Sequence, residues 1–315
     1  MGAGADDGNA HALVCALPAD AIISYQQAIV ESSEVCVSVV TDMGQWLRFV
    51  ESARPDAANP LTLVNGRGQR ASLFVGPDVA VVWPSRDLSD AQMRAVREVE
   101  IGEAIAARLG MAGGRRVVTY DGESVPTCTL ILFDGEIWRT NGVGWLTRRY
   151  PGLRVVTIDA GACAQREAEL TDADRVAALL QAVCDEAGAG PVMVAGQSYG
   201  GLAALEVGLR QDLPVDEIVA QSPSLWWGGA ARGMGEGTLM RDLRSGVAAP
   251  HPGVTLRLQV GTLEQTMRPV VDDCAELLRS LGAHVELDHY RSGHDVAWWR
   301  EGLIRALDEW RALTY

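Results

Sequence analysis

Basic residues, phenylalanine and closely spaced cysteines are all scarce in this chain of 315 residues. Lys and Arg number 27 against 41 Asp and Glu, so the net charge is −14. Such a surface repels nucleic-acid phosphates and anionic lipid headgroups, and we expect neither a nucleic acid nor a membrane as partner. The six cysteines show no CxxC or CxxxC spacing, which favours reduced, mostly buried thiols over a metal site: Cys15, Cys36, Cys128, Cys163, Cys184 and Cys274. We expect no bound metal and no cofactor.

Long apolar runs are also missing. The chain has no run of about 18 apolar residues, the length needed to cross a membrane. The apolar stretch Ala12–Leu17 is short and no Lys or Arg precedes it, unlike a signal peptide. We therefore expect a cytoplasmic protein, whose oligomeric state stays open. The length and the 48% hydrophobic content allow one large α/β domain with a smaller element.

Residues 1–110 predict a small β-rich domain with a connecting helix. Four short β-like runs are present: Val35–Val40, Leu61–Val64, Ala71–Val75 and Val79–Trp83. Asn65-Gly66 lies between the second and third runs and indicates a hairpin. Ser89-Asp-Ala-Gln92 forms a capping box, which predicts a helix that continues to Leu109 and stops at Gly110.

Residues 111–315 predict a second, catalytic domain in which strands and helices alternate. The predicted strands are Val117–Tyr120, Thr129–Phe133, Val155–Ile158, Val192–Ala195, Glu217–Ala220, Thr255–Val260 and Val285–His289. The predicted helices are Asp172–Ala187, Gly200–Leu209, Pro269–Leu281 and Val296–Ala312. Alternation of this kind implies a mostly parallel central sheet covered by helices on both faces, which is the α/β class.

The segment Gly196-Gln197-Ser198-Tyr199-Gly200 is the strongest functional signal. An apolar strand, Pro191–Ala195, precedes it and a helical pattern follows from Leu202. A turn this tight holds the serine in a strained conformation that only small neighbours permit, and it lifts the hydroxyl above the sheet edge. We predict Ser198 as a nucleophile; a Gly-rich turn that carries an exposed serine by chance is the alternative interpretation.

A serine hydroxyl needs a base, and histidine has the pKa for that task. The chain order of α/β hydrolases is serine, acid, histidine, with the histidine after the last strand. His294 fits this order, whereas His284 and His289 fall within the last predicted strand. Glu264 is the first carboxylate after Thr255–Val260 and is predicted to accept the imidazole Nδ1 proton. A solvated loop carboxylate is the alternative for Glu264.

Several ordered segments resemble the enterochelin (enterobactin) esterases, which open iron-loaded triscatecholate trilactone siderophores inside bacteria. The similar segments are Val194–Ala204 around the serine, Gln221–Trp227, Ser292–Leu303, Phe133–Trp138 and Arg166–Leu170. The resemblance covers about residues 115–315; before them only Pro55–Pro60 is similar, and the first domain, a β-sandwich in the family, is shortened here. The resemblance implies an α/β-hydrolase fold and a siderophore esterase activity.

Acyl transfer also needs two backbone N–H donors for the oxyanion. One is expected from Tyr199, directly after the nucleophile. The other is expected from Gly135, in the turn Asp134-Gly135, where a glycine lets the backbone approach closely.

Aromatic and basic residues in the similar segments are candidate substrate contacts. The chain has nine Trp against three Phe, and flat aromatic walls suit catechol rings. The candidates are Trp138, Trp226, Trp227 and Trp298 with Arg139, Arg166, Arg291 and Arg300. Core packing is the alternative for each tryptophan, and Trp299 is in register with the apolar positions of its helix. Exposed arginines are common, and Arg166 either lines the pocket or forms a salt bridge with Glu169.

The leading hypothesis is a serine esterase that hydrolyses a catecholate trilactone siderophore, such as enterobactin, through an acyl-enzyme on Ser198. The small-molecule substrate is expected to be an ester or macrolactone, with iron present only as part of it. The alternative is another acyl-transfer enzyme on the same fold: a thioesterase, a depsipeptide cyclase or a general carboxylesterase. A siderophore-binding protein without catalysis is a rival from another class.

Overall fold

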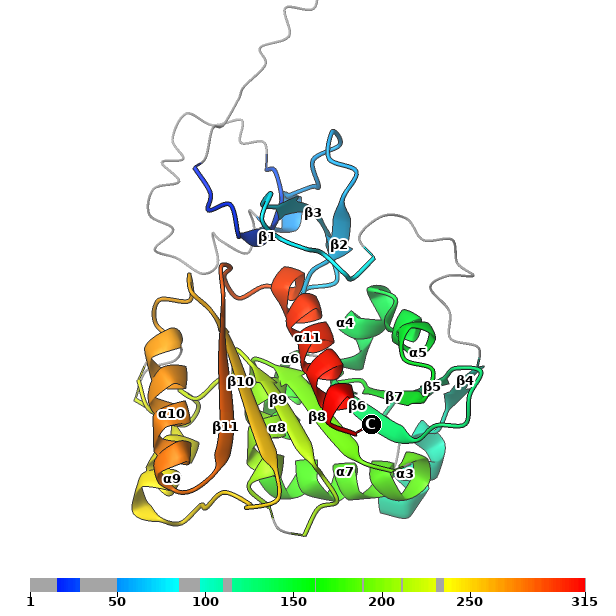
Figure 1. Ribbon diagram of the computed structural model, residues 1–315, viewed down its shortest axis with the longest axis vertical. Helices are drawn as coiled ribbons and strands as arrows, with labels where there is room; N and C mark the ends of the chain where they lie inside the picture. Colours follow the sequence, from blue (N-terminus) through cyan, green and yellow to red (C-terminus); the bar gives the residue numbers. More distant parts are fainter. Residues whose placement is uncertain are drawn as a thin grey trace, which may run out of the picture.

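The computed structural model describes residues 16–28, 50–84, 97–109, 115–161, 163–188, 190–210, 212–230 and 235–314. These residues form an eight-stranded sheet flanked by helices and a separate three-stranded sheet at one end of the molecule (Figure 1). This is the predicted α/β arrangement with a small β-rich element before it.

The large sheet is mostly parallel, as predicted. Its strands are β4 (Arg97–Glu100), β5 (Val117–Asp121), β6 (Cys128–Phe133), β7 (Leu153–Ile158), β8 (Val192–Gln197), β9 (Glu217–Gln221), β10 (Thr255–Gly261) and β11 (His284–Tyr290). They lie in the order β11-β10-β9-β8-β6-β7-β5-β4. The strands from β11 to β7 are parallel, and β5 and β4 are antiparallel to their neighbours. The carboxyl ends of β8, β9, β10 and β11 therefore meet at one edge.

Helices cover both faces of this sheet. They are α3 (Gly102–Leu109), α4 (Gly135–Thr140), α5 (Leu146–Arg149) after a 3-10 turn (Val143–Trp145), α6 (Cys163–Leu170), α7 (Ala173–Ala187), α8 (Tyr199–Gly208), α9 (Thr238–Ser245), α10 (Arg268–Ser280) and α11 (Val296–Thr314). The four predicted helices are confirmed as α7, α8, α10 and α11, with bounds shifted by about two residues at most.

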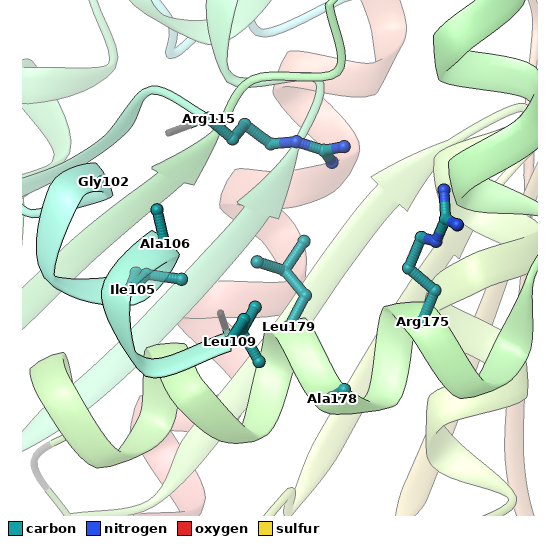
Figure 2. Close-up of a pocket in the computed structure, with 8 residues that line it drawn as sticks. All are labelled: Gly102, Ile105, Ala106, Leu109, Arg115, Arg175, Ala178 and Leu179. Carbon is teal, nitrogen blue, oxygen red and sulfur yellow. The ribbon is translucent and has the colours of Figure 1, made fainter. Parts of the chain in front are cut away.

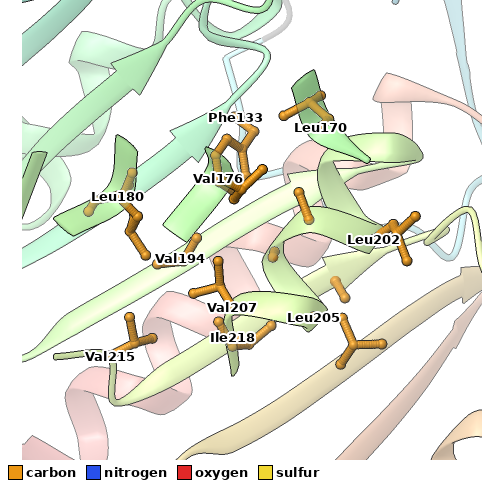
Figure 3. Close-up of a cluster of buried hydrophobic side chains, with 14 of the residues drawn as sticks. Phe133, Leu170, Val176, Leu180, Val194, Leu202, Leu205, Val207, Val215 and Ile218 are labelled. Carbon is orange, nitrogen blue, oxygen red and sulfur yellow. The ribbon is translucent and has the colours of Figure 1, made fainter. Parts of the chain in front are cut away.

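Strand β6 shows how the two faces divide. Ile131 and Phe133 point to the face covered by α7, α8 and α10. Figure 3 shows Phe133 on this face together with side chains of α7 and α8. Leu130 and Leu132 point to the opposite face, under α4, α5 and α11. The strand is apolar on both sides because both of its faces are buried.

The small sheet contains the predicted hairpin. Strands β1 (Ile22–Tyr25), β2 (Thr62–Val64) and β3 (Arg70–Val75) lie antiparallel in the order β1-β3-β2. The loop between β2 and β3 is closed by Asn65, whose side-chain oxygen accepts the N–H groups of Arg67 (2.9 Å) and Gln69 (3.1 Å). The inner face of this sheet packs on the first turns of α11.

The predicted strand Val79–Trp83 is wrong: this segment forms no strand. The backbone N–H groups of Val82 and Trp83 donate to the carboxylate of Glu301 (2.8 and 3.1 Å) instead of to a neighbouring strand. Trp83 is buried, and its indole N–H donates to the carbonyl of Asn141 (2.9 Å). The segment is therefore held by side-chain contacts.

The predicted helix from Ser89 to Leu109 is also wrong in part. Of its described residues, 97–109, the helical part is α3, and Arg97–Glu100 before it pairs with β5 as an edge strand. The reason is tertiary, since these polar residues satisfy their backbone groups along the exposed edge of the large sheet. The capping box at 89–92 and the run Val35–Val40 lie outside the described residues. The division into two domains at residue 110 stays a prediction, although β4 belongs to the large sheet.

The described cysteines behave as small apolar side chains. Within the described part of the chain, Cys128, Cys184 and Cys274 form no disulfide. Burial raises the pKa of Cys184 to about 11 and that of Cys274 to about 12, so both stay protonated and unreactive at neutral pH. Among the described helices, none combines the length and apolar character needed to cross a bilayer.

Glu206 on α8 gives the first testable prediction. Burial, with the charges of Asp242 and Asp172, raises the pKa of Glu206 to about 7, and its Oε2 has no hydrogen-bond partner among the described residues. A pKa raised on folding stabilises the fold below the unfolded value near 4.5 and loses that contribution as pH rises through about 7. We expect Glu206→Gln to increase the free energy of unfolding at pH 8. This increase should exceed the variant's effect at pH 4.5 by about 3 kcal/mol.

Urea unfolding of wild type and variant at the two pH values measures this difference. The exposed Glu276→Gln on α10 is the matched control and changes the free energy of unfolding by less than about 0.5 kcal/mol. Equal stabilisation by Glu206→Gln at both pH values would contradict the prediction.

Candidate active site

Ser198 lies at a sharp turn between β8 and α8. Its φ of 57° and ψ of −116° are strained for a residue with a side chain. A Cβ on Gly196 would lie 2.2 Å from the carbonyl oxygen of Gly200, so only glycine permits the two sides of the turn to approach. The Ser198 N–H donates to Gln221 (3.0 Å), and the Ser198 carbonyl accepts from Ser224 (3.0 Å). The predicted strand-to-helix turn is therefore present.

Glu264 and His294 form a hydrogen-bonded pair. The imidazole Nδ1 lies 2.8 Å from Oε2 of Glu264. The Glu264 side chain is 2% exposed and the His294 side chain 41% exposed. The buried end of the pair is thus the carboxylate, and the imidazole reaches solvent. This contact holds the ring by Nδ1 and leaves Nε2 for other partners.

The three predicted catalytic residues follow parallel strands of the same sheet. Ser198 follows β8, Glu264 follows β10 and His294 follows β11, so all three lie at the carboxyl edge. Among the described residues the Ser198 hydroxyl is paired with the hydroxyl of Ser224 (3.3 Å) and not with His294. Catalytic hydrogen bonds are often long or unformed without substrate.

The loop after β9 supplies residues that sequence reasoning missed as site residues. Ser222, with a φ of 44°, donates its hydroxyl to Oε1 of Glu264 (2.6 Å). Ser224, two residues later, contacts Ser198. The signal was present in the similar segment Gln221–Trp227, which follows the strand between those of the nucleophile and the acid. Only the contacts themselves show which serine serves which partner.

The two expected oxyanion donors open helices that follow neighbouring strands, β8 and β6. Tyr199 is the first residue of α8 and Gly135 the first of α4. A Cβ on Gly135 would lie 2.8 Å from Oδ1 of Asp159 and 2.9 Å from the Ile158 nitrogen, so the backbone approach there requires glycine. A Cβ on Gly200 would lie 3.0 Å from Asp134 Oδ2, which places the two turns against each other.

The candidate tryptophans divide into two pairs. Trp226 and Trp227 are half-buried, and their rings pack on the ring of Tyr199 at centroid distances of 5.6 and 5.5 Å. Trp138 and Trp298 are 1% and 0% exposed and belong to the hydrophobic core. For these two, core packing, and not substrate contact, describes the observed position.

Three of the candidate arginines are paired with carboxylates. Arg139 pairs with Asp159, Arg166 with Asp134, and Arg291 with Asp20. The Arg166 pair is bidentate (2.6 and 2.8 Å) and lies against the nucleophile turn, where the guanidinium also approaches the carbonyl of Gln197 (3.3 Å). The expected partner Glu169 instead pairs with Arg115.

Arg300 is not a surface cation. Its side chain is 1% exposed and lies over the ring of Trp83 at 5.9 Å. Burial lowers the pKa of its guanidinium to about 10. The prediction that Arg300 contacts substrate is therefore wrong, because the helix turns this side chain into the core.

A hollow and a shallow surface depression lie among the described residues. The hollow, of about 170 Å³, lies between α3 and α7 and contains no residue of the Ser198 turn or the His294 loop (Figure 2). The depression lies beside Trp226 and is lined by Pro223, Leu225, Trp226, Gly235, Thr266, Met267 and Val270. Its lining residues include the two neighbours of Ser224 in sequence but none of Ser198, Glu264 and His294. Within the described part of the chain, no group of three or more His, Cys, Asp or Glu side chains is placed to hold a metal ion.

Comparisons with known proteins find esterases. The family model "Esterase", described as "Putative esterase", matches residues 160–310. The iron(III) enterobactin esterase of Escherichia coli O6:H1 (strain CFT073) is 29% identical over 290 residues, covering 86% of this chain and 70% of the relative. The crystal structure of the enterobactin esterase from Shigella flexneri in the presence of enterobactin is 28% identical, with a TM-score of 0.75, covering 94% of this chain and 80% of that one.

The fold and the comparisons together define an esterase of the α/β-hydrolase class. Within that class, the chain is similar to the iron(III) enterobactin esterases.

Substitution of Arg166 tests whether its ion pair with Asp134, beside the Ser198 turn, stabilises the fold. Arg166→Met leaves the Asp134 carboxylate, which is 1% exposed, without its bidentate partner. We expect the free energy of unfolding to fall by about 3 kcal/mol, since a buried charge loses its compensation.

Chemical denaturation measures this loss. Arg210→Met is the matched control: it removes an exposed pair with Asp174 and should cost less than about 1 kcal/mol. Equal losses in the two variants would show that the Arg166–Asp134 pair carries no special weight.

Proposed function

We propose that this enzyme hydrolyses the ester bonds of a catecholate trilactone siderophore, such as enterobactin, through an acyl-enzyme on Ser198. The observation that carries the proposal is the hydrogen-bonded pair of Glu264 and His294 (2.8 Å) at the sheet edge where the strained Ser198 lies. The substrate class is supported by the likeness, over 94% of the chain, to an esterase whose structure was determined in the presence of enterobactin.

In the proposed first step, His294 Nε2 takes the proton of the Ser198 hydroxyl as its oxygen attacks the ester carbonyl carbon. Glu264 accepts the hydrogen bond from Nδ1–H and stabilises the imidazolium that forms. The N–H groups of Tyr199 and Gly135 receive the oxyanion. The carbon–oxygen ester bond then breaks, and His294 returns the proton to the leaving alcohol.

In the second step, water replaces the alcohol. His294 takes a proton from the water as the hydroxide oxygen attacks the acyl-enzyme, and Ser198 leaves with that proton. The balance is one ester and one water consumed, one acid and one alcohol formed. The proposed steps use no cofactor, and any iron belongs to the substrate.

Substrate recognition is assigned to the aromatic group Tyr199, Trp226 and Trp227. The two tryptophans are half-buried and follow the loop that contacts Ser198. Their faces offer stacking and apolar burial to a catechol ring near the scissile bond. The Arg166 guanidinium lies 5.4 Å from the Tyr199 ring centroid and completes this wall.

Ser198→Ala is the direct test of the nucleophile. We expect kcat to fall by about four to six orders of magnitude with folding intact, because the remaining groups cannot form the acyl-enzyme. Wild type is quenched during turnover of enterobactin and digested. Mass spectrometry of the peptides should then show an acyl adduct on the one that contains Ser198.

Ser280→Ala, which removes a hydroxyl exposed on α10, is the matched control and keeps wild-type turnover. If Ser198→Ala hydrolyses enterobactin at the wild-type rate, the proposed mechanism is wrong.

Trp226→Ala tests the recognition site. We expect KM for a catechol-bearing serine ester to rise about tenfold, since a stacked aromatic pair contributes about 0.5–1.5 kcal/mol beyond its buried area. Hydrolysis of p-nitrophenyl acetate, which has no catechol ring, should stay near wild type. Trp226→Phe keeps a ring at the position and should restore most of the affinity. An equal loss on both esters would assign Trp226 to folding and not to recognition.

A further inference from the structure

We propose that Ser222 and Trp299 are positioning residues that fix the Glu264 carboxylate in the orientation that serves His294. This inference rests on the proposed function, in which Glu264 is the acid of the catalytic group. Neither residue was predicted from sequence to take part in the site. The two belong to different elements, the loop after β9 and helix α11.

Each oxygen of the Glu264 carboxylate has its own partners. Oε1 accepts the Ser222 hydroxyl (2.6 Å) and the N–H of Gly261 (2.8 Å). Oε2 faces Nδ1 of His294 (2.8 Å). A buried carboxylate with donors on both oxygens cannot rotate without losing a hydrogen bond that no water replaces. The partners on Oε1 therefore hold Oε2 toward the imidazole.

The indole of Trp299 sets the direction of the Ser222 hydroxyl. An indole N–H is a donor only, and Trp299 Nε1 lies 3.2 Å from Ser222 Oγ. The oxygen of Ser222 must accept this hydrogen bond, and its single proton is then directed to Oε1 of Glu264. Both Ser222 and Glu264 are buried, so no solvent competes for these positions. Trp299 thus donates to Ser222, and Ser222 donates to Glu264.

The backbone of Ser222 is strained in order to make this contact. Its φ of 44° is in the left-handed region, which disfavours residues with a side chain. Its N–H donates to the carbonyl of Gln259 in β10 (2.7 Å), which holds the strained residue beside the strand that precedes Glu264. Strain of this kind is retained where the surrounding structure over-determines the conformation.

Trp299 also contacts the base directly. The rings of Trp299 and His294 meet at 87° with centroids 4.9 Å apart. The same side chain therefore limits the movement of the imidazole and orients the hydroxyl that holds its acid. Loss of the N–H and loss of the ring are separable, because Trp299→Phe removes the first and keeps most of the second.

The experiment is a double-mutant cycle on kcat with Ser222→Ala, Trp299→Phe and the double variant. We expect Ser222→Ala to lower kcat about 10- to 100-fold, the range for a lost hydrogen bond to a charged group. Trp299→Phe should lower kcat about 3- to 10-fold, and the double variant should equal Ser222→Ala, since the indole acts through the hydroxyl. KM should change less than about twofold, because neither group touches the substrate.

Controls separate this network from folding. Ser72→Ala removes a buried hydroxyl in the small sheet, and Trp310→Phe changes a buried tryptophan elsewhere in α11; both should keep wild-type kcat. Ser222→Gly suits the positive φ and, if Ser222→Ala fails to fold, takes its place with the same expected loss. Three results would overturn the proposal. The kcat losses of the two single variants could multiply in the double variant, KM could rise, or kcat could stay unchanged in Ser222→Ala.

The proposed function fails in a different way. All variants are assayed on both enterobactin and p-nitrophenyl acetate, and the network predicts the same fold loss on each, since it acts through the base. If enterobactin is not hydrolysed, the acetate still reports on Ser222 and Trp299. If Ser198→Ala keeps full activity on both esters, the catalytic assignment itself is wrong.

Discussion

The left-handed turn at Ser198 is the constraint on which the rest of the site depends. An L-residue held at a φ of 57° is costly, and the surrounding backbone must impose it. Two hydrogen bonds do so, since the N–H of Ser198 donates to Gln221 and its carbonyl accepts from Ser224. Both partners belong to the end of β9 and its loop, the neighbour of β8 in the sheet. The position of Ser198, the predicted nucleophile, therefore depends on the loop that also contacts Glu264.

The small N-terminal sheet supports the other half of the site. The N–H of Ile22 donates to the carbonyl of Arg291 (3.3 Å), and the N–H of Ser24 donates to the carboxylate of Asp295 (2.5 Å). These contacts flank the loop that carries His294. Trp298 packs against the same sheet, and its indole N–H donates to the Gly293 carbonyl (2.6 Å). The small sheet carries none of the predicted catalytic residues, and it contacts the loop of His294, the predicted base, on both sides.

The sequence predicted what local chemistry determines. The glycines around Ser198 and the Asn-Gly hairpin predict turns, because few backbone conformations fit them. The apolar runs of β6 and β8 predict strands that are buried on both faces. It did not predict β4, because pairing at a sheet edge depends on a partner, β5, that lies about twenty residues away. Nor did it predict that Trp138 and Trp298 are core residues while Trp226 is half-buried, because the facing of a tryptophan follows from packing.

The charge of the arginines at the site also depends on their tertiary partners. Arg139 and Arg166 were expected to supply positive charge, yet each pairs with a carboxylate, Asp159 or Asp134, in a contact that carries no net charge. Asp134 precedes the expected oxyanion donor Gly135, and the Arg166 guanidinium also reaches the carbonyl that precedes Ser198. In this chain of net charge −14, these two cations hold backbone turns in place. For the catecholate substrate that we propose, recognition is then assigned chiefly to aromatic contact at Trp226 and Trp227, which are half-buried.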